Sequence, residues 1–324
     1  MPPAETTVLV LGHRFASLDV ERRVFAGLAE VVDGTQLGPD ERRPAIARAR
    51  AVLLGTRDRV DAAAIGAMDA CRVIVRYGAG VDNIDVDAAT RRGIVVSNVR
   101  DYAVEEVSDH ALALLLAANR RLVPAVASAR ARQWNTAAMA GTRRLATQTV
   151  GVVGFGRIGQ AMARKVRPLV ARVVAFDPVV APAAMLDRGV EPATLDELLR
   201  SSDYLSIHCP LTATTRHLFN GAVLARMRPT AWLINTSRGE IVDERALAEA
   251  VAGRRIAGAM LDVLTQEPPP EDHPLVGLDG VVLTPHVAYF SVEAMQDLQR
   301  LAAEEARRVL RGEQPLSAVN QGGA

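Results

Sequence analysis

Short apolar runs alternate with amphipathic stretches along the whole chain. In the N-terminal part, apolar runs predict strands at Thr7–Gly12, Ala51–Gly55, Val73–Tyr77 and Ile94–Ser97. Helical spacing predicts helices between them at Leu18–Leu28 and Asp61–Ala67. Strands that alternate with helices are typical of α/β folds with parallel sheets. We therefore expect this part to form one small α/β unit.

A long helix is predicted at Val104–Arg121. It begins with two acidic residues, Glu105 and Glu106, and ends with two arginines, a distribution that suits the helix dipole. Its apolar residues recur at helical spacing. The segment Gln133–Gln148 is irregular and polar, and a loop of this length in a compact domain usually serves function or an interface.

A second series of strands and helices begins at Thr149. Strands are expected at 149–154, 172–177, 203–208, 231–235, 256–262 and 280–284. Helices are expected at 157–170, 194–201, 221–227 and 243–252. We expect the last helix, Ser291–Arg311, to return to the first unit and make that domain discontinuous.

A glycine-rich motif opens the second series, with the sequence Gly154-Phe155-Gly156-Arg157-Ile158-Gly159. The motif is informative because a buried type of strand precedes it and a helical pattern follows. Gly154 permits a tight turn, Gly156 lets the backbone approach a pyrophosphate, and Gly159 permits close helix–strand packing. The helix N-terminus adds unpaired N–H groups for the pyrophosphate. Arg157 either contacts the pyrophosphate, which we favour, or is a solvated charge.

The carboxylate of Asp177 ends the next strand, about 20 residues after the motif. A carboxylate there accepts hydrogen bonds from the ribose hydroxyls and repels a 2′-phosphate. Pro178 follows, and no arginine is near to receive a phosphate. The sequence therefore predicts NAD in preference to NADP.

Three polar residues follow strands of the second series: Arg238, Glu267 and His286. Ligands of an open parallel sheet bind at the carboxyl ends of its strands. An arginine fork binds a carboxylate and polarises a carbonyl. Histidine exchanges a proton, since its ordinary pKa is roughly 6.5. We assign Glu267 to orienting the imidazole. His208 is the best rival, although its place favours lining the cofactor.

Composition excludes several classes of protein. The net charge of +1 argues against a nucleic-acid protein with a basic field. No apolar run reaches the ~20 residues of a membrane span, and the start Met1–Thr7 lacks the features of a signal peptide. Two cysteines are too few for a zinc site or a disulfide framework. We expect a soluble cytoplasmic protein without a metal. Lys165 is the only lysine, so the Tyr-x-x-x-Lys arrangement of short-chain dehydrogenases is absent.

Together these stretches resemble the D-isomer-specific 2-hydroxyacid dehydrogenase family. The stretches that carry the resemblance are Arg76–Asp85, Val152–Gly159, Leu233–Asp243, Gly258–Val263 with Glu267-Pro268, and Thr284–His286. The resemblance implies two Rossmann-like or flavodoxin-like domains with parallel sheets and an active site in the cleft between them. We place the substrate-binding domain at 1–102 with 290–324 and the NAD-binding domain at 103–289.

The family's functional residues can be carried over one at a time. Arg238, Glu267 and His286 match its catalytic residues, and the loop Gly78-Ala79-Gly80 matches the segment that holds the substrate carboxylate. Further matches, expected around the cofactor, are Cys209, Pro210 and Thr215 at the adenosine, with Thr236 and Asp262 at the nicotinamide. The long helix 104–121 and the segment 122–148 match the family's dimer interface, so we expect a homodimer.

Several details are similar to the family's C-terminal-binding protein branch. That branch uses the arginine that matches Arg76, and has a tryptophan where this chain has Tyr289, around its substrate. Arg76 is either a second carboxylate contact or a salt-bridge partner of Asp82 or Asp85.

The sequence thus predicts an NAD-dependent D-2-hydroxyacid dehydrogenase that reduces a small 2-oxo acid. Within this class, glyoxylate or hydroxypyruvate, 3-phosphoglycerate and phosphite are alternative substrates, although a phosphite enzyme is expected to carry lysine at position 76. The other alternative is an NAD-sensing scaffold like the co-repressors of the C-terminal-binding protein branch. We expect neither nucleic acid nor membrane as a partner.

Overall fold

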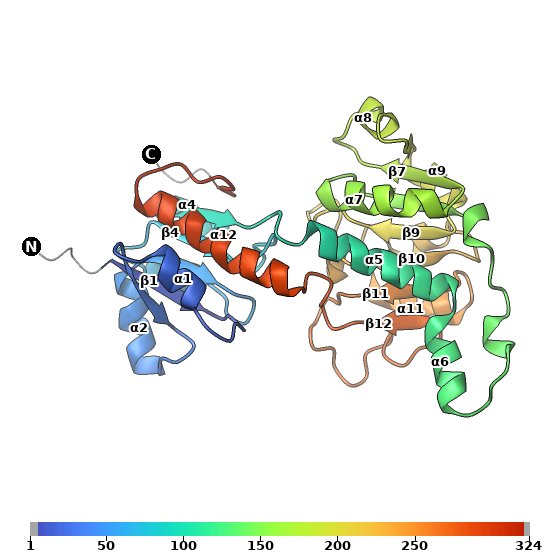
Figure 1. Cartoon of the computed structure of the whole chain (residues 1–324), viewed down its shortest axis with the longest axis horizontal. Coiled ribbons are helices and arrows are strands. Elements are labelled where there is room, and N and C mark those ends of the chain that lie inside the picture. The colour runs from blue at the N-terminus through green and yellow to red at the C-terminus, as the bar shows by residue number, and fades with distance from the viewer. Residues whose placement is uncertain (1–5, 321–324) are drawn as a thin grey trace, which may run out of the picture. The chain divides into compact units, whose positions relative to one another are not determined.

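The computed structural model describes residues 6–320, without the side chains of Pro39 and Ala138. The first five residues, part of the stretch for which no signal peptide is expected, lie outside this range. The chain divides into two compact units, Met1–Ala103 with Ser291–Ala324, and Val104–Phe290 (Figure 1). That the first binds substrate and the second binds NAD stays a prediction.

The first unit is built on a parallel sheet of five strands in the order β2-β1-β3-β4-β5. The strands are β1 (Thr7–Leu11), β2 (Glu30–Asp33), β3 (Ala49–Leu54), β4 (Val73–Arg76) and β5 (Val95–Asn98). The helices are α1 (Asp19–Val24), α2 (Pro39–Arg48), α3 (Ala62–Gly66), α4 (Val86–Arg91) and α12 (Val292–Leu310). The strand order is that of flavodoxin-like folds.

Side chains on the two faces of this sheet enter two separate cores. Val8 and Val10 of β1 pack with Ala302 of α12, while Leu9 and Leu11 pack with Ile65 of α3. Helices α1 and α12 cover the first face (Figure 1). Because successive strand residues point to opposite faces, a continuous apolar strand requires helices on both sides.

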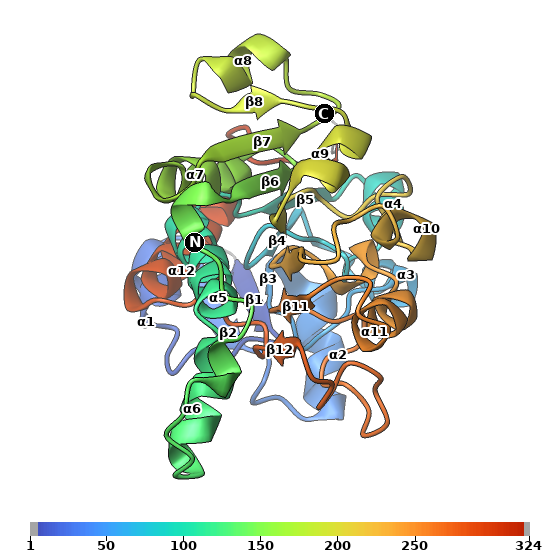
Figure 2. The same ribbon diagram turned by 90° about the vertical axis from the view of Figure 1, so that its right-hand side faces the viewer.

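The second unit holds a parallel sheet of seven strands in the order β12-β11-β10-β9-β6-β7-β8. The strands are β6 (Thr149–Val153), β7 (Arg172–Phe176), β8 (Glu191–Pro192), β9 (Tyr204–Ile207), β10 (Trp232–Asn235), β11 (Gly258–Leu261) and β12 (Val281–Leu283). The helices are α5 (Val104–Asn119), α6 (Leu122–Arg130), α7 (Arg157–Val166), α8 (Pro182–Leu186), α9 (Leu195–Ser201), α10 (Gly221–Leu224) and α11 (Glu244–Ala252). Figure 2 shows α5 and α7 on one face of this sheet and α9 to α11 on the other. The chain order of the strands reverses between the neighbours β6 and β9. The carboxyl ends of these two strands therefore form the topological switch point of the sheet.

The expected class, two α/β domains with parallel sheets, is confirmed. The pattern did not predict β2, β8, α2, α4, α6 and α8. The long helix ends at Asn119, because Arg121 takes a left-handed conformation with φ of 49°, and α6 starts at Leu122. Within the described range no single helix is both long and apolar enough to cross a membrane, and only α5 with α6, bent by 62°, pass that test as a pair.

Candidate active site

The glycine-rich loop connects β6 to α7, as the motif predicts for a dinucleotide loop. A Cβ built on Gly154, whose φ is +89°, lies 2.5 Å from the backbone N of Cys209. A Cβ on Gly159 lies 2.1 Å from the carbonyl oxygen of Gly154. A Cβ on Gly156 meets no described heavy atom within 4 Å. Close backbone packing therefore requires glycine at positions 154 and 159, while Gly156 leaves open space at the start of α7.

The carboxylate of Asp177 holds this loop. Its Oδ2 accepts from the backbone N of Phe155 at 2.7 Å, and its Oδ1 accepts from Val179 N at 2.8 Å and Val180 N at 3.2 Å. An ionised carboxylate has about four lone-pair sites. Asp177 can therefore still accept a hydroxyl.

The segment after β9 packs against the glycine loop. The ring of His208 bonds Ser206 Oγ through Nε2 at 2.8 Å. Burial lowers the pKa of His208 to about 4, so this histidine is neutral near pH 7 and is a poor proton donor. Thr215 Oγ1 donates to the carbonyl of Pro210 at 2.6 Å and so fixes the turn after Cys209.

Two buried polar atoms of this part of the unit have no partner within residues 6–320. They are Nδ1 of His208 and Oγ1 of Thr236. A buried polar group without a partner costs free energy, so such atoms are expected where a ligand supplies the missing bond. Both follow strands of the predicted cofactor edge, β9 and β10.

Glu267 and His286 are in direct contact. His286 Nδ1 lies 2.6 Å from Glu267 Oε2, and the backbone N of Leu264 donates to Glu267 Oε1 at 2.9 Å. Burial raises the pKa of Glu267, but the bond to His286, its charge and the charge of Arg238 lower it, and the net pKa lies below the ordinary value. Glu267 is thus a carboxylate at neutral pH, and Nε2 of His286 is the nitrogen that can exchange a proton with a substrate.

The backbone around His286 is strained, and hydrogen bonds to Asp262 hold it in place. His286 has φ of 53°, a left-handed conformation that is uncommon for a residue with a Cβ. Its N–H donates to the carbonyl of Asp262 at 2.9 Å. The buried carboxylate of Asp262 accepts from Val287 N at 3.0 Å and Ala288 N at 2.9 Å. We call residues 284–288 the histidine loop. Strain of this kind persists where surrounding contacts fix it, and it concentrates at functional sites.

Arg238 precedes a 3₁₀ turn, Gly239–Ile241, just after β10. A Cβ on Gly239 lies 2.1 Å from the carbonyl carbon of Leu264, so the two loops pack backbone to backbone. Arg238 Nη1 donates to the carbonyl of Ser237 at 2.7 Å. The structure thereby brings the three predicted catalytic residues to one edge of the sheet. Tyr289 joins them, with its ring 6.1 Å from that of His286 in an edge-on arrangement.

The predicted substrate loop lies in the first unit, after β4. Gly78 has φ of +125°, and its carbonyl accepts from Val99 N at 3.1 Å. Asn98 Nδ2 donates to the carbonyl of Ala79 at 2.6 Å. Arg76 Nη1 donates to the carbonyl of Tyr77 at 2.6 Å. These contacts fix the course of the loop, and they leave both readings of Arg76 open.

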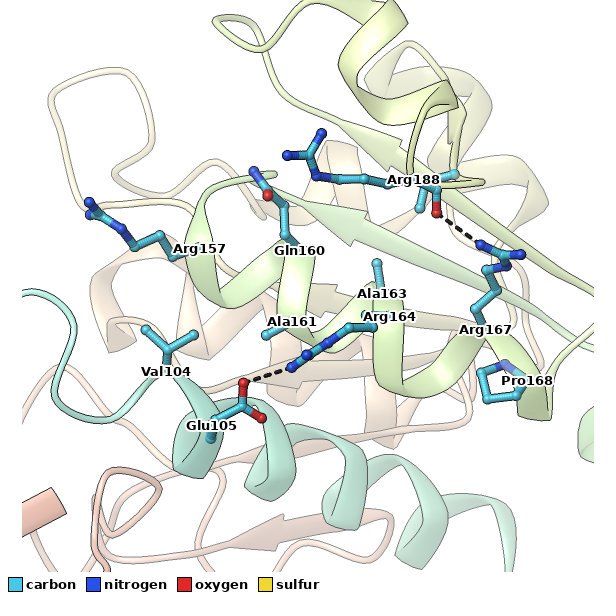
Figure 3. Close-up of a pocket in the computed structure, with 11 residues that line it drawn as sticks. Val104, Glu105, Arg157, Gln160, Ala161, Ala163, Arg164, Arg167, Pro168 and Arg188 are labelled. Carbon is cyan, nitrogen blue, oxygen red and sulfur yellow. Dashed lines mark hydrogen bonds and ion pairs between the residues drawn. The ribbon is translucent and has the colours of Figure 1, made fainter. Parts of the chain in front are cut away.

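A pocket of about 750 Å³ runs along α7 and is also lined by the start of α5 and by Arg188 and Val190 (Figure 3). Arg157 lines it at the N-terminal end of the helix, but Arg238, Glu267 and His286 do not. Arg164 pairs with Glu105 at 2.6 Å, and Arg167 donates to the carbonyl of Arg188 at 3.2 Å. The pocket is therefore not the site of the predicted chemistry. Within residues 6–320 no three His, Cys, Asp or Glu side chains are grouped to hold a metal ion.

Sequence reasoning missed Thr284 and His110. Thr284 Oγ1 donates to Asp262 Oδ1 at 2.5 Å, and His110 Nε2 lies 3.0 Å from the same hydroxyl. Thr284 stands two residues before His286, and this proximity in sequence could have indicated a role beside the histidine. His110 had none, because its partner is 174 residues away along the chain.

A family model described as "D-isomer specific 2-hydroxyacid dehydrogenase, NAD binding domain" matches residues 112–288. The D-3-phosphoglycerate dehydrogenase of Mycobacterium tuberculosis is 41% identical over 288 residues, which are 88% of this chain and 54% of that protein. The chain thus spans about half the length of the phosphoglycerate dehydrogenases that it matches.

Two further relatives match over most of both chains. The glyoxylate reductase of Korarchaeum cryptofilum is 42% identical over 267 residues, 82% of this chain and 80% of that protein. The solved structure of D-mandelate dehydrogenase from Rhodotorula graminis is 27% identical, covers 99% of each chain and superposes with a TM-score of 0.88. These matches do not test the resemblance to the C-terminal-binding protein branch, which stays a prediction.

Proposed function

We propose that this chain, which belongs to the D-isomer-specific 2-hydroxyacid dehydrogenase family, is an NAD-dependent reductase of a small 2-oxo acid. Membership of the family, predicted from the motifs, is confirmed. The observation that carries the proposed activity is the 2.6 Å contact between His286 Nδ1 and Glu267 Oε2. A carboxylate at Nδ1 favours the protonated imidazole and leaves Nε2 as the proton donor.

The residues of the second unit fit a dinucleotide. Open space at Gly156 admits a pyrophosphate beside the N-terminal end of α7. Asp177 retains capacity to accept a ribose hydroxyl, and the buried hydroxyl of Thr236 has no partner among the residues that the structure describes. NAD, when bound, supplies the hydride chemistry. Since Asp177 would repel a 2′-phosphate, we propose NAD in preference to NADP.

Each residue of the candidate site has one proposed task. Arg238 binds the carboxylate of the substrate and polarises its carbonyl through a fixed fork of N–H groups. The loop Gly78-Ala79-Gly80 of the first unit remains the proposed substrate-binding segment of that unit. His286 Nε2 donates a proton to the C2 oxygen during reduction and accepts it during oxidation. Glu267 accepts the hydrogen bond from Nδ1–H of His286 and so leaves Nε2 for the proton transfer.

The substrate is proposed by class only. Relatives are named phosphoglycerate dehydrogenase and glyoxylate reductase, and both names describe 2-hydroxy or 2-oxo acids. The test is NADH oxidation, followed by absorbance, with glyoxylate, hydroxypyruvate, pyruvate and branched or aromatic 2-oxo acids, and 3-phosphoglycerate and phosphite with NAD. Turnover of one member supports the proposal. Tight NADH binding without turnover of any member would contradict it and favour an NAD-sensing scaffold.

We also propose a homodimer through α5, α6 and the segment up to residue 148. Four exposed large apolar side chains lie there: Leu122 is 54% exposed, Val123 48%, Val126 41% and Trp134 86%. Apolar surface of this kind is typical of a protein interface. Sedimentation of the purified chain tests this, and a monomer at micromolar concentration would refute it.

A further inference from the structure

His110 contacts the network that supports the catalytic histidine, and none of the proposed tasks uses it. It lies on α5, in the same compact unit as His286. Its Nε2 lies 3.0 Å from Thr284 Oγ1 and 3.5 Å from Asp262 Oδ1. The side chain of His110 is 23% exposed and that of Asp262 only 1%. The contact is therefore largely shielded from water.

The hydrogen bonds around Thr284 require a proton on Nε2 of His110. Asp262 acts as an acceptor, because two backbone N–H groups of the histidine loop donate to its carboxylate. Thr284 Oγ1 therefore donates its single proton to Asp262. Toward His110 the same hydroxyl can only accept. His110 must then present an N–H at Nε2.

This N–H decides where the hydroxyl proton of Thr284 points. Without it, the hydroxyl is free to rotate away from Asp262, and the carboxylate loses one of its donors. Asp262 also holds Val287 N and Ala288 N, and its carbonyl accepts from His286 N. A looser Asp262 therefore loosens the segment in which His286 keeps its left-handed backbone.

We propose that His110 is a positioning residue for His286: its Nε2–H orients the Thr284 hydroxyl toward Asp262, which holds the histidine loop. The inference rests on the proposed function, in which His286 is the proton donor. His110 touches neither substrate nor cofactor in this account, and it acts only through Thr284 and Asp262.

The test compares two replacements of His110. His110→Leu keeps much of the volume and removes the N–H, whereas His110→Gln places an amide N–H near the position of Nε2. With the 2-oxo acid that the wild type reduces, His110→Leu should lower kcat by roughly tenfold through misplacement of the imidazole. The Kd for NADH should rise by a smaller factor, because the carboxylate of Asp262, which the family resemblance also places at the nicotinamide, is itself unchanged. His110→Gln should recover most of the loss. Asp109→Asn, on the same helix and facing Lys165, controls for general disturbance of α5.

A second mutation separates positioning from general damage. In a His286→Gln background the proton donor is gone, so His110→Leu should lower kcat little further. Fully additive losses would overturn the proposal, and so would equal losses in the Leu and Gln variants. If His286→Gln alone leaves turnover intact, the proposed function fails; if it abolishes turnover while His110→Leu has no effect, only the role of His110 fails.

A readout without turnover uses protein labelled with ¹⁵N in its histidine rings. The chain has six histidines, so single variants can assign the signals. The wild type should show a proton on Nε2 of His110. The ring signals of His286 should shift in His110→Leu and stay in place in His110→Gln. An Nε2 of His110 without a proton, or unmoved His286 signals in the Leu variant, would refute the inference.

Discussion

Replacing Gly156 by alanine separates cofactor binding from folding. A Cβ at Gly156 meets no described heavy atom within 4 Å, and φ there is −71°, which any residue adopts. Alanine is a poorer N-cap than glycine, which lowers the stability of the fold. It also restricts the unfolded chain, which raises the stability by about 0.4–1 kcal/mol, so the two effects oppose one another. The variant should therefore keep its Tm within about 4 °C.

Its cofactor affinity should fall. The added methyl group occupies the approach of the pyrophosphate to the start of α7. Losing one hydrogen bond between a backbone N–H group and a charged phosphate costs about 1.5–3 kcal/mol, which is roughly a 10- to 150-fold rise in Kd. Fluorescence titration with NADH measures the Kd, and calorimetry measures the Tm.

Two other glycines provide the controls. Gly66→Ala, at the end of α3, also meets no described atom within 4 Å and should change neither property. Gly159→Ala puts a Cβ 2.1 Å from the Gly154 carbonyl oxygen and should destabilise the fold by roughly 1–3 kcal/mol. Wild-type NADH affinity in a folded Gly156→Ala variant would refute the position of the pyrophosphate, and a large fall in its Tm would refute the open geometry.

Three further variants test single residues. Arg238→Lys replaces a fork by a point charge and should lower kcat/KM about 10- to 150-fold, the loss of one charged hydrogen bond; steady-state kinetics that match the wild type would contradict that role. Glu267 has a lowered pKa, so its carboxylate contributes at neutral pH and the contribution is lost as pH falls through that pKa. Glu267→Gln should therefore lower reductive kcat by roughly 10²-fold at neutral pH, with a gap to the wild type that narrows in acid, and a gap that is constant with pH would argue against the charge. Asp177→Asn keeps an oxygen for Phe155 N but removes the charge, so the preference for NAD over NADP should fall by at least about tenfold; an unchanged ratio of the two Kd values would show that another residue selects the cofactor.

Local patterns predicted the elements that form the centre of each sheet. Strands such as β6 and β10 are continuous apolar runs, because helices cover both of their faces. The missed elements lack this signal. Strand β2 has only two apolar residues between Glu30 and Asp33, and half of the residues of α2 are charged, with Pro44 inside the helix. Both depend on packing against neighbours that are distant in sequence.

In the candidate site, too, some residues could be found from local patterns and others could not. Arg238, Glu267 and His286 could be found because each follows a recognisable strand or motif, and parallel strands end at one edge. The second role of Asp177, which is to hold the glycine loop through Phe155 N, required coordinates. The support of His286 by Asp262, Thr284 and His110 also required them, since no local pattern pairs a residue of α5 with the loop after β12.

The most direct test of the account is the effect of His286→Gln on turnover and on NADH binding, measured with the same protein. A lost general acid–base should lower kcat by roughly 10²–10⁴-fold, while the Kd for NADH stays within about threefold, because His286 contacts Glu267 and lies apart from the glycine loop in sequence and role. Turnover equal to that of the wild type in the variant would contradict the central claim that His286 is the proton donor.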